Sequence, residues 1–155
     1  MDLYKLLQDL DIAYEEQDHE AVFTVAQAQA LKARLSGCGC KNLLLTNKKH
    51  TAYFLAIMEA EAKADLKALS GLAGAGRLSF ASPEELMDLM GLIPGSVSPF
   101  GLINDQEGRV GVLLSKELVG QRLIFHPNTN CKSLVLSYED FLKYLQAVGR
   151  EPMFY

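Results

Sequence analysis

"KNLLLTNKKHTAYFLAIM", residues 41 to 58, contains two apolar runs on either side of a polar turn. The runs occupy residues 43–45 and 52–58, and "TNKKH" separates them. Apolar, strand-forming runs joined by a short polar segment are typical of a β-hairpin. Because each run is almost continuously apolar, we expect both strands to be buried on both faces.

Further elements are predicted on both sides of this hairpin. Helices are expected over residues 3–10, 24–36, 65–72, 82–90 and 138–148, from apolar spacing and from caps such as Ser82 with Pro83 and Glu85. Strands are expected over residues 77–81, 122–127 and 132–137, with a second hairpin that turns at residues 104–108 between "LIN" and "RVGVLLS". The pattern predicts an α/β fold over residues 1–155, a single domain whose mixed, mostly antiparallel sheet curls into a partial barrel flanked by helices.

The composition excludes several classes of protein. The chain of 155 residues is 49% hydrophobic and 22% charged, with no apolar run long enough to span a membrane and no secretory signal at its start. Three cysteines without framework spacing suit a reducing compartment, so we expect a cytoplasmic protein. A net charge of −4 argues against wrapping of a duplex nucleic acid, and any such contact should be local.

A second segment, "GLIPGSVSPFGL" at residues 91–102, combines glycines and prolines with apolar side chains. A surface linker would be more polar, and a core strand would not accept this many glycines and prolines. The segment is therefore predicted to be an apolar loop of defined shape.

Three places in the sequence could carry chemistry. Lys41 opens the first strand of the hairpin, Lys48 and Lys49 lie at its tip, and His126 ends a later strand. For each lysine a solvated side chain is the simpler explanation, and for His126 a turn residue bonded to the backbone competes equally with a base. No phosphate loop or nucleophile elbow is present, and three dispersed histidines do not favour a metal site, so no metal or cofactor is expected.

Four stretches of the chain resemble a known family in sequence and in order. They are "HEAVFTVAQA", "CKNLLLTNKKHTAYFLAIM", "GSVSPFGL" and "LIFHPNTNCKSLVLSYEDFLKYLQAVG". The chain resembles the trans-editing prolyl-tRNA deacylases, which are similar to the YbaK-like deacylases and to the insertion domain of bacterial prolyl-tRNA synthetase. The likeness covers residues 14–149, and it is strongest to the branch that hydrolyses alanyl-tRNA(Pro).

The resemblance implies an active site. It assigns catalytic roles to Lys41, Gly95 and His126. It assigns substrate contacts to Asn42, Ser96, Val97, Ser98, Pro99, Phe100 and Asn130. In this family a water, activated in part by the free hydroxyl of the terminal ribose, is thought to cleave the ester, and loop amides stabilise the oxyanion. The partner implied is the acceptor end of a mischarged tRNA(Pro).

Other interpretations remain open on the sequence. The substrate could carry cysteine or another small residue instead of alanine, with Val97 and Phe100 as the positions that would decide it. A non-catalytic adaptor that binds a tRNA end or a protein is a second possibility. A small-molecule ester or thioester hydrolase is a third, disfavoured because no nucleophile and base are paired.

Overall fold

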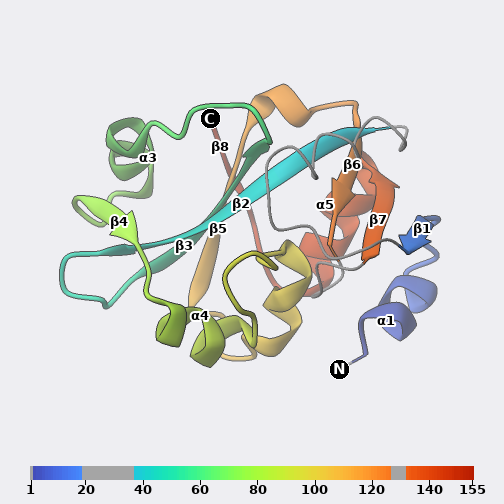
Figure 1. Cartoon of the computed structure of the whole chain (residues 1–155), viewed down its shortest axis with the longest axis horizontal. Helices are drawn as coiled ribbons and strands as arrows, with labels where there is room; N and C mark the ends of the chain where they lie inside the picture. The colour runs from blue at the N-terminus through green and yellow to red at the C-terminus, as the bar shows by residue number, and fades with distance from the viewer. Residues whose placement is uncertain (1, 19–36, 127–131) are drawn as a thin grey trace.

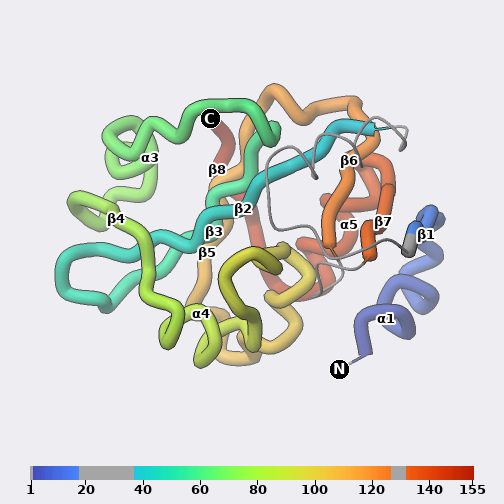
Figure 2. Tube along the Cα trace, viewed as in Figure 1, coloured from blue at the N-terminus to red at the C-terminus, as the bar shows by residue number. Residues whose placement is uncertain are grey.

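Eight strands form one curled sheet in the computed structural model, which describes residues 2–18, 37–126 and 132–155. The strands are Glu15–Asp18 (β1), Cys38–Asn47 (β2), Tyr53–Glu59 (β3), Leu78–Phe80 (β4), Val110–Leu114 (β5), Arg122–Phe125 (β6), Lys132–Ser137 (β7) and Met153–Phe154 (β8). Their order is β1-β7-β6-β2-β3-β5-β8, and β4 pairs with β2 off this path. Figures 1 and 2 show β2 crossing the molecule from β6 at one end to β4 at the other.

The helices lie against this sheet and at its ends. They are Leu3–Asp9 (α1), Leu66–Ala73 (α3), Pro83–Met90 (α4) and Tyr138–Ala147 (α5), with short 3-10 helices at Pro99–Asn104 (η1) and Lys116–Leu118 (η2). Side-chain caps fix their starts as the sequence predicts: Ser82 and Glu85 form a capping box on α4, and the Ser137 side chain accepts from the amide of Asp140 on α5. The mixed α/β fold with a mostly antiparallel curled sheet is confirmed.

The predicted hairpin is present as β2 and β3, which pair antiparallel from Cys40↔Glu59 to Thr46↔Tyr53. Successive side chains of a strand point to opposite faces, so the hairpin supplies two cores. One face carries Leu44, Leu55 and Ile57 into a large core, which also contains α1, α4, α5 and η1. The other face carries Leu45 and Ala56 into a smaller core closed by α3.

The second predicted hairpin is wrong. A tight turn exists, in which the Gly108 amide donates to the Asp105 carbonyl, but no strand precedes it. Residues 99–104 form η1 instead, because Ser98 caps the helix and Pro99 occupies its first turn. The Asp105 carboxylate then accepts from the amides of Arg109 and Val110, and β5 leaves to pair in parallel with β3.

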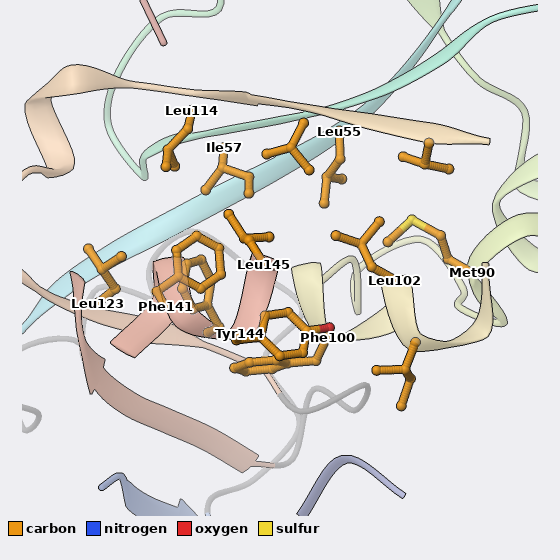
Figure 3. Close-up of a cluster of buried hydrophobic side chains, with 14 of the residues drawn as sticks. Leu55, Ile57, Met90, Phe100, Leu102, Leu114, Leu123, Phe141, Tyr144 and Leu145 are labelled. Atoms are coloured by element: carbon orange, nitrogen blue, oxygen red, sulfur yellow. The ribbon is translucent and has the colours of Figure 1, made fainter. Parts of the chain in front are cut away.

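Aromatic rings join η1 to the C-terminal helix inside the large core (Figure 3). Phe100 packs edge-on against Phe125 and Tyr144, with centroids 5.8 and 5.2 Å apart. The Tyr144 hydroxyl donates to the Pro99 carbonyl over 2.8 Å. Burial raises the pKa of Tyr144 well above its usual range, so this hydroxyl stays protonated as a donor.

The predicted helix over residues 24–36 lies outside the described residues. Among the helices that the structure describes, none combines the length and apolar character needed to cross a bilayer.

Candidate active site

Among the described residues, the edge of β2 that faces away from β3 is covered at its two ends and open in between. At one end Cys38 and Gly39 pair with β6, and at the other residues 45–47 pair with β4. The Ala81 amide donates to the Leu44 carbonyl over 2.9 Å, so the backbone groups of Leu44 point to this edge. Backbone direction alternates along a strand, and those of Asn42 therefore point the same way. Neither the amide nor the carbonyl of Asn42 has a strand partner there among the described residues.

A hollow of about 290 Å³ lies over this opening. Its walls come from β2, from β4 and the start of α4, and from the loop between α4 and η1, which passes beside β2 in Figure 1. The lining residues are Asn42, Leu43, Leu44, Phe80, Ala81, Ser82, Pro83, Leu86, Pro94, Gly95 and Val97. Because Asn42 and Leu43 project to opposite faces of β2, the hollow reaches around both sides of the open edge.

The Asn42 side chain leaves one polar atom unpaired in this hollow. Its Nδ2 donates to the Val97 carbonyl at 3.5 Å, which holds the amide in one orientation. Its Oδ1 is buried and has no hydrogen-bond partner among the described residues. A buried acceptor without a donor is costly, and such atoms are rare in native proteins. A residue that lines the hollow therefore carries a buried acceptor that lacks a donor.

The loop from Pro94 to Pro99 depends on the backbone conformation of Gly95. Gly95 has φ of +91°, a backbone conformation suited to glycine, and a Cβ added there would meet no atom within 4 Å. The Ser96 amide donates to the Ile93 carbonyl, whereas the amides of Gly95 and Val97 donate to no described residue. A negative charge that develops beside the open strand edge could accept hydrogen bonds from these two amides.

Lys41 lies beside the hollow but on the far side of the strand from Asn42. It is paired with Met58, whose side chain belongs to the small core, so Lys41 projects with Leu43 and not with Asn42. Leu43 lines the hollow and Lys41 does not. Residues two apart on one face of a strand are separated by about 6.5–7 Å, a span that a lysine side chain covers. Lys41 is half-buried and forms no ion pair with any residue of the described segments.

His126 and Phe100 are outside the lining of the hollow. The Nδ1 of His126 lies 2.8 Å from the Lys132 carbonyl, so this histidine ties the end of β6 to β7. Phe100 is fully buried and points into the large core. Asn130 lies outside the described residues.

The serines and Pro99 of the loop act mainly within the protein. Ser98 is fully buried, and its hydroxyl accepts from the Phe100 amide at 3.2 Å. Ser96 and Pro99 are buried as well. Of the predicted loop residues, Gly95 and Val97 therefore line the hollow, while the other three hold the loop in place.

A network of polar side chains holds α4, whose first residues form one wall of the hollow. Glu85 accepts from the Tyr53 hydroxyl at 2.6 Å and from the Ser82 amide at 2.9 Å, and the His50 Nδ1 lies 2.8 Å from it. The hydrogen bond from Tyr53 is the main cause that lowers the pKa of Glu85 to about 2. Glu85 is therefore a carboxylate at neutral pH that joins α4 to the tip of the β2–β3 hairpin.

Five further basic residues of the described segments divide into two groups. Lys132 and Arg122 lie near Glu16 and Glu15 on the β1 side of the sheet, at 3.8 and 3.4 Å. Lys48, Lys49 and Arg77 are exposed at the hairpin tip and beside β4, without an ion pair among the residues described. The described side chains contain no group of three metal-ligand residues placed to hold an ion.

Sequence reasoning missed the opening in β2, Phe80 and the contribution of α4. The opening depends on where β4 and β6 stop along β2, which no local pattern reports. The sequence did indicate that the Lys41 and Asn42 side chains project in opposite directions, because neighbouring residues on a strand point to opposite faces.

Comparison with known proteins places this fold and hollow in a family. Residues 19–144 match the family described as the aminoacyl-tRNA editing domain. The prolyl-tRNA editing protein ProX of Acetoanaerobium sticklandii is 37% identical over 144 residues, 92% of this chain and 88% of ProX. The multifunctional Ser/Thr-tRNA deacylase ProXp-y of Escherichia coli K12 is 28% identical over 146 residues, 93% and 86% of the two chains. A crystal structure titled as a candidate trans-editing enzyme for prolyl-tRNA synthetase superposes with a TM-score of 0.74 at 20% identity, over 98% of this chain and 92% of the other.

The chain belongs to the aminoacyl-tRNA editing domain family. The prediction of a trans-editing deacylase of the YbaK-like type is confirmed at the level of the family, as is aminoacyl-tRNA deacylase activity.

Proposed function

We propose that the protein hydrolyses the ester of mischarged alanyl-tRNA(Pro), with the aminoacyl group held at the open edge of β2. The observation that carries this proposal is the buried, unpaired Oδ1 of Asn42, a residue that lines a hollow of about 290 Å³. Every aminoacyl ester offers an α-amino group, a donor that would satisfy this acceptor. The backbone groups of Asn42 at the same edge give two more polar contacts.

The walls around Asn42 favour a small side chain. Leu44, Leu86 and Val97 supply apolar surface for a methyl group. Apolar contact alone separates substrates that differ by one methylene by only about 1–3 kcal/mol, so exclusion of proline has to be steric. The loop can provide such a limit, because Tyr144 and the Ser98 cap anchor it to the core.

Cleavage in this proposal uses a water molecule and no protein nucleophile. The water adds to the ester carbonyl, the carbonyl oxygen takes the negative charge, and the terminal ribose leaves as its hydroxyl. The free amides of Gly95 and Val97 are the candidate oxyanion donors. Lys41, on the Leu43 side of the edge, provides a cation for the terminal phosphate, and Lys48, Lys49 and Arg77 add local attraction that salt should weaken.

Serine or threonine is a second candidate aminoacyl group, suggested by the E. coli relative that is named a Ser/Thr-tRNA deacylase. Ser82 lines the hollow, and its hydroxyl oxygen, which accepts from the Glu85 amide, has a second lone pair that can accept from a substrate hydroxyl. Cysteine, the alternative expected from the sequence, would rely on apolar contact alone.

The test is hydrolysis of tRNA(Pro) charged in turn with alanine, serine, threonine, cysteine and proline. We expect alanine to be released fastest and proline to be retained. Asn42→Ala should lower kcat/KM about 10- to 100-fold through loss of a charge-assisted contact, and Asn42→Asp should keep part of the activity. Lys41→Ala should raise KM and flatten the salt dependence, with the exposed Lys116→Ala as its matched control.

Each result separates the candidates. Faster release of serine or threonine keeps the enzyme class and replaces the substrate. Retardation of tRNA without ester cleavage would favour the adaptor. Full activity in Asn42→Ala would refute the assignment of the site to the open edge.

A further inference from the structure

Phe80 is the most exposed large apolar side chain in the described part of the chain, at 60%. It is the last residue of β4 and lines the same hollow as Asn42, Pro94 and Gly95. Ile93, next to Pro94 in the loop, is also exposed, at 56%. Single exposed apolar residues are common, but an exposed aromatic ring at the mouth of a hollow indicates a contact with a ligand or partner.

The backbone holds Phe80 in place although its ring is free. Phe80 is paired with Leu45, and the next residue, Ala81, donates to Leu44. The Ser82 capping box of α4 follows at once. A ring carried by a strand end fixed on both sides loses little freedom when it binds something, which favours its use as a binding platform.

The face of the sheet from which the Phe80 side chain projects also supports a binding role. Phe80 shares its face of the sheet with Leu45 and Leu43, and Leu78 shares it too. Leu78 is buried beneath α3, whereas Phe80 lies at the open end of the strand. Lys41 projects from the same face. The Phe80 ring and the Lys41 cation, which has no ion pair among the described residues, therefore lie on one side of the opening, and the Asn42 side chain lies on the other.

We propose that Phe80 stacks the unpaired terminal base of the tRNA 3′ end while the ester is held at the open edge of β2. This inference rests on the proposed function, because it requires an aminoacyl-tRNA substrate. The terminal ribose carries the ester, so its base is only one sugar away from the reacting carbonyl. Unpaired bases are recognised largely by stacking on aromatic side chains, a contact that tolerates any sequence.

The proposal also accounts for a chain with net charge −4 that acts on a nucleic acid. Stacking of one base adds affinity without phosphate contacts and without counterion release. Binding would then depend on one ring and a few lysines near the hollow. Most of the acidic surface would not face the tRNA.

The experiment compares the wild type with Phe80→Ala, Phe80→Leu and Phe80→Trp, and with Phe154→Ala as matched control. Phe154 is an exposed phenylalanine, at 41%, that lies on β8 and outside the lining of the hollow. Two readouts are used: kcat/KM for alanyl-tRNA(Pro), and the fluorescence of uncharged tRNA(Pro) with 2-aminopurine at its terminal position, which stacking quenches. Thermal unfolding checks that each variant is folded.

We expect Phe80→Ala and Phe80→Leu to lower kcat/KM about tenfold or more and to abolish the quenching. Phe80→Trp should retain both, and Phe154→Ala should match the wild type. The effect should fall mainly on KM, because the ring contacts the base and not the ester.

Two results would overturn the inference, and they can be told apart. If the wild type cleaves the ester while Phe80→Leu keeps its kcat/KM and its quenching, stacking is refuted and the deacylase assignment stands; Phe80 then serves a protein partner or none. If the wild type cleaves none of the charged tRNAs, the proposed function and this inference fall together.

Discussion

Residues 93–95 and residues 98–103 belong to one glycine- and proline-containing segment, yet they lie in opposite environments. Ile93, Pro94 and Gly95 are exposed, whereas every residue from 98 to 103 is buried. The first part, the rim, contributes Pro94 and Gly95 to the lining of the hollow. The second part, the anchor, is held by aromatic packing and by the hydrogen bond from Tyr144. The difference teaches that a loop can have a defined shape at a site when the adjacent residues belong to the core.

The largest effect on stability should come from the anchor. Phe100→Ala removes a fully buried ring that contacts Phe125 and Tyr144. Loss of a buried phenylalanine costs about 3–5 kcal/mol in the free energy of unfolding, from lost burial and the cavity left behind. Urea unfolding measures it. Ile93→Ala in the rim is the control and should change the free energy by less than about 0.5 kcal/mol. Similar losses in both variants would remove the distinction between rim and anchor.

Gly95→Ala should affect the rim more through its shape than through contacts. At φ of +91° an alanine is strained, by about 1–2 kcal/mol, although a Cβ would meet no atom within 4 Å. We expect a modest loss of stability and a larger loss of kcat/KM for alanyl-tRNA(Pro), because the Gly95 amide would shift. Gly74→Ala, at φ of +68° with equally open space and far from the hollow, is the control for strain alone. Equal activity in Gly95→Ala and the wild type would show that the rim tolerates a change of shape.

Ser98→Ala tests the junction between rim and anchor. It removes the acceptor for the Phe100 amide, a cap whose loss costs about 1 kcal/mol. We expect a lower free energy of unfolding by urea and a smaller, parallel decrease in activity. Ser98→Thr keeps the hydroxyl, and any loss it shows reports the added methyl group instead of the cap.

A pH-dependent effect is expected from the hydrogen-bond network that supports the rim through α4. The folded pKa of Glu85 is about 2 against an ordinary value of 4.5, so the ionised carboxylate stabilises the folded protein. This contribution is present above pH 4.5 and is lost as the pH falls toward 2. The difference in unfolding free energy between wild type and Glu85→Gln should therefore shrink between these values. A difference that stays constant with pH would exclude the carboxylate as its source.

Local signals predicted most of the fold. Ser82 and Ser137 marked helix starts correctly, and the hairpin of residues 41–58 showed its apolar runs without ambiguity. The prediction of a hairpin at residues 104–108 was wrong because it recognised the turn but not the helix cap formed by Ser98. A Ser-Pro pair before apolar residues is a helix start, and here that signal was read as part of a loop.

The site was predictable only in part. Asn42, Gly95 and Val97 were expected on the strength of the family resemblance, and they line one hollow. Phe100 was expected there too, but contacts with residues 125 and 144, distant in sequence, draw it into the core. The sequence did not indicate a role for Phe80, because an apolar residue in a short strand is ordinarily buried. Its exposure depends on how far α3 extends over β4.

The open edge of β2 has a consequence for how the protein avoids self-association. An unpaired strand edge is a template on which another chain can add a strand and begin an aggregate. Within the described segments, the unpaired stretch comprises the few residues around Asn42, bounded at one end by β4 and at the other by β6. A single aminoacyl group fits such a short opening, but an incoming strand would collide with both neighbours. The same two strands that delimit the site therefore keep its free backbone groups from recruiting a second copy of the chain.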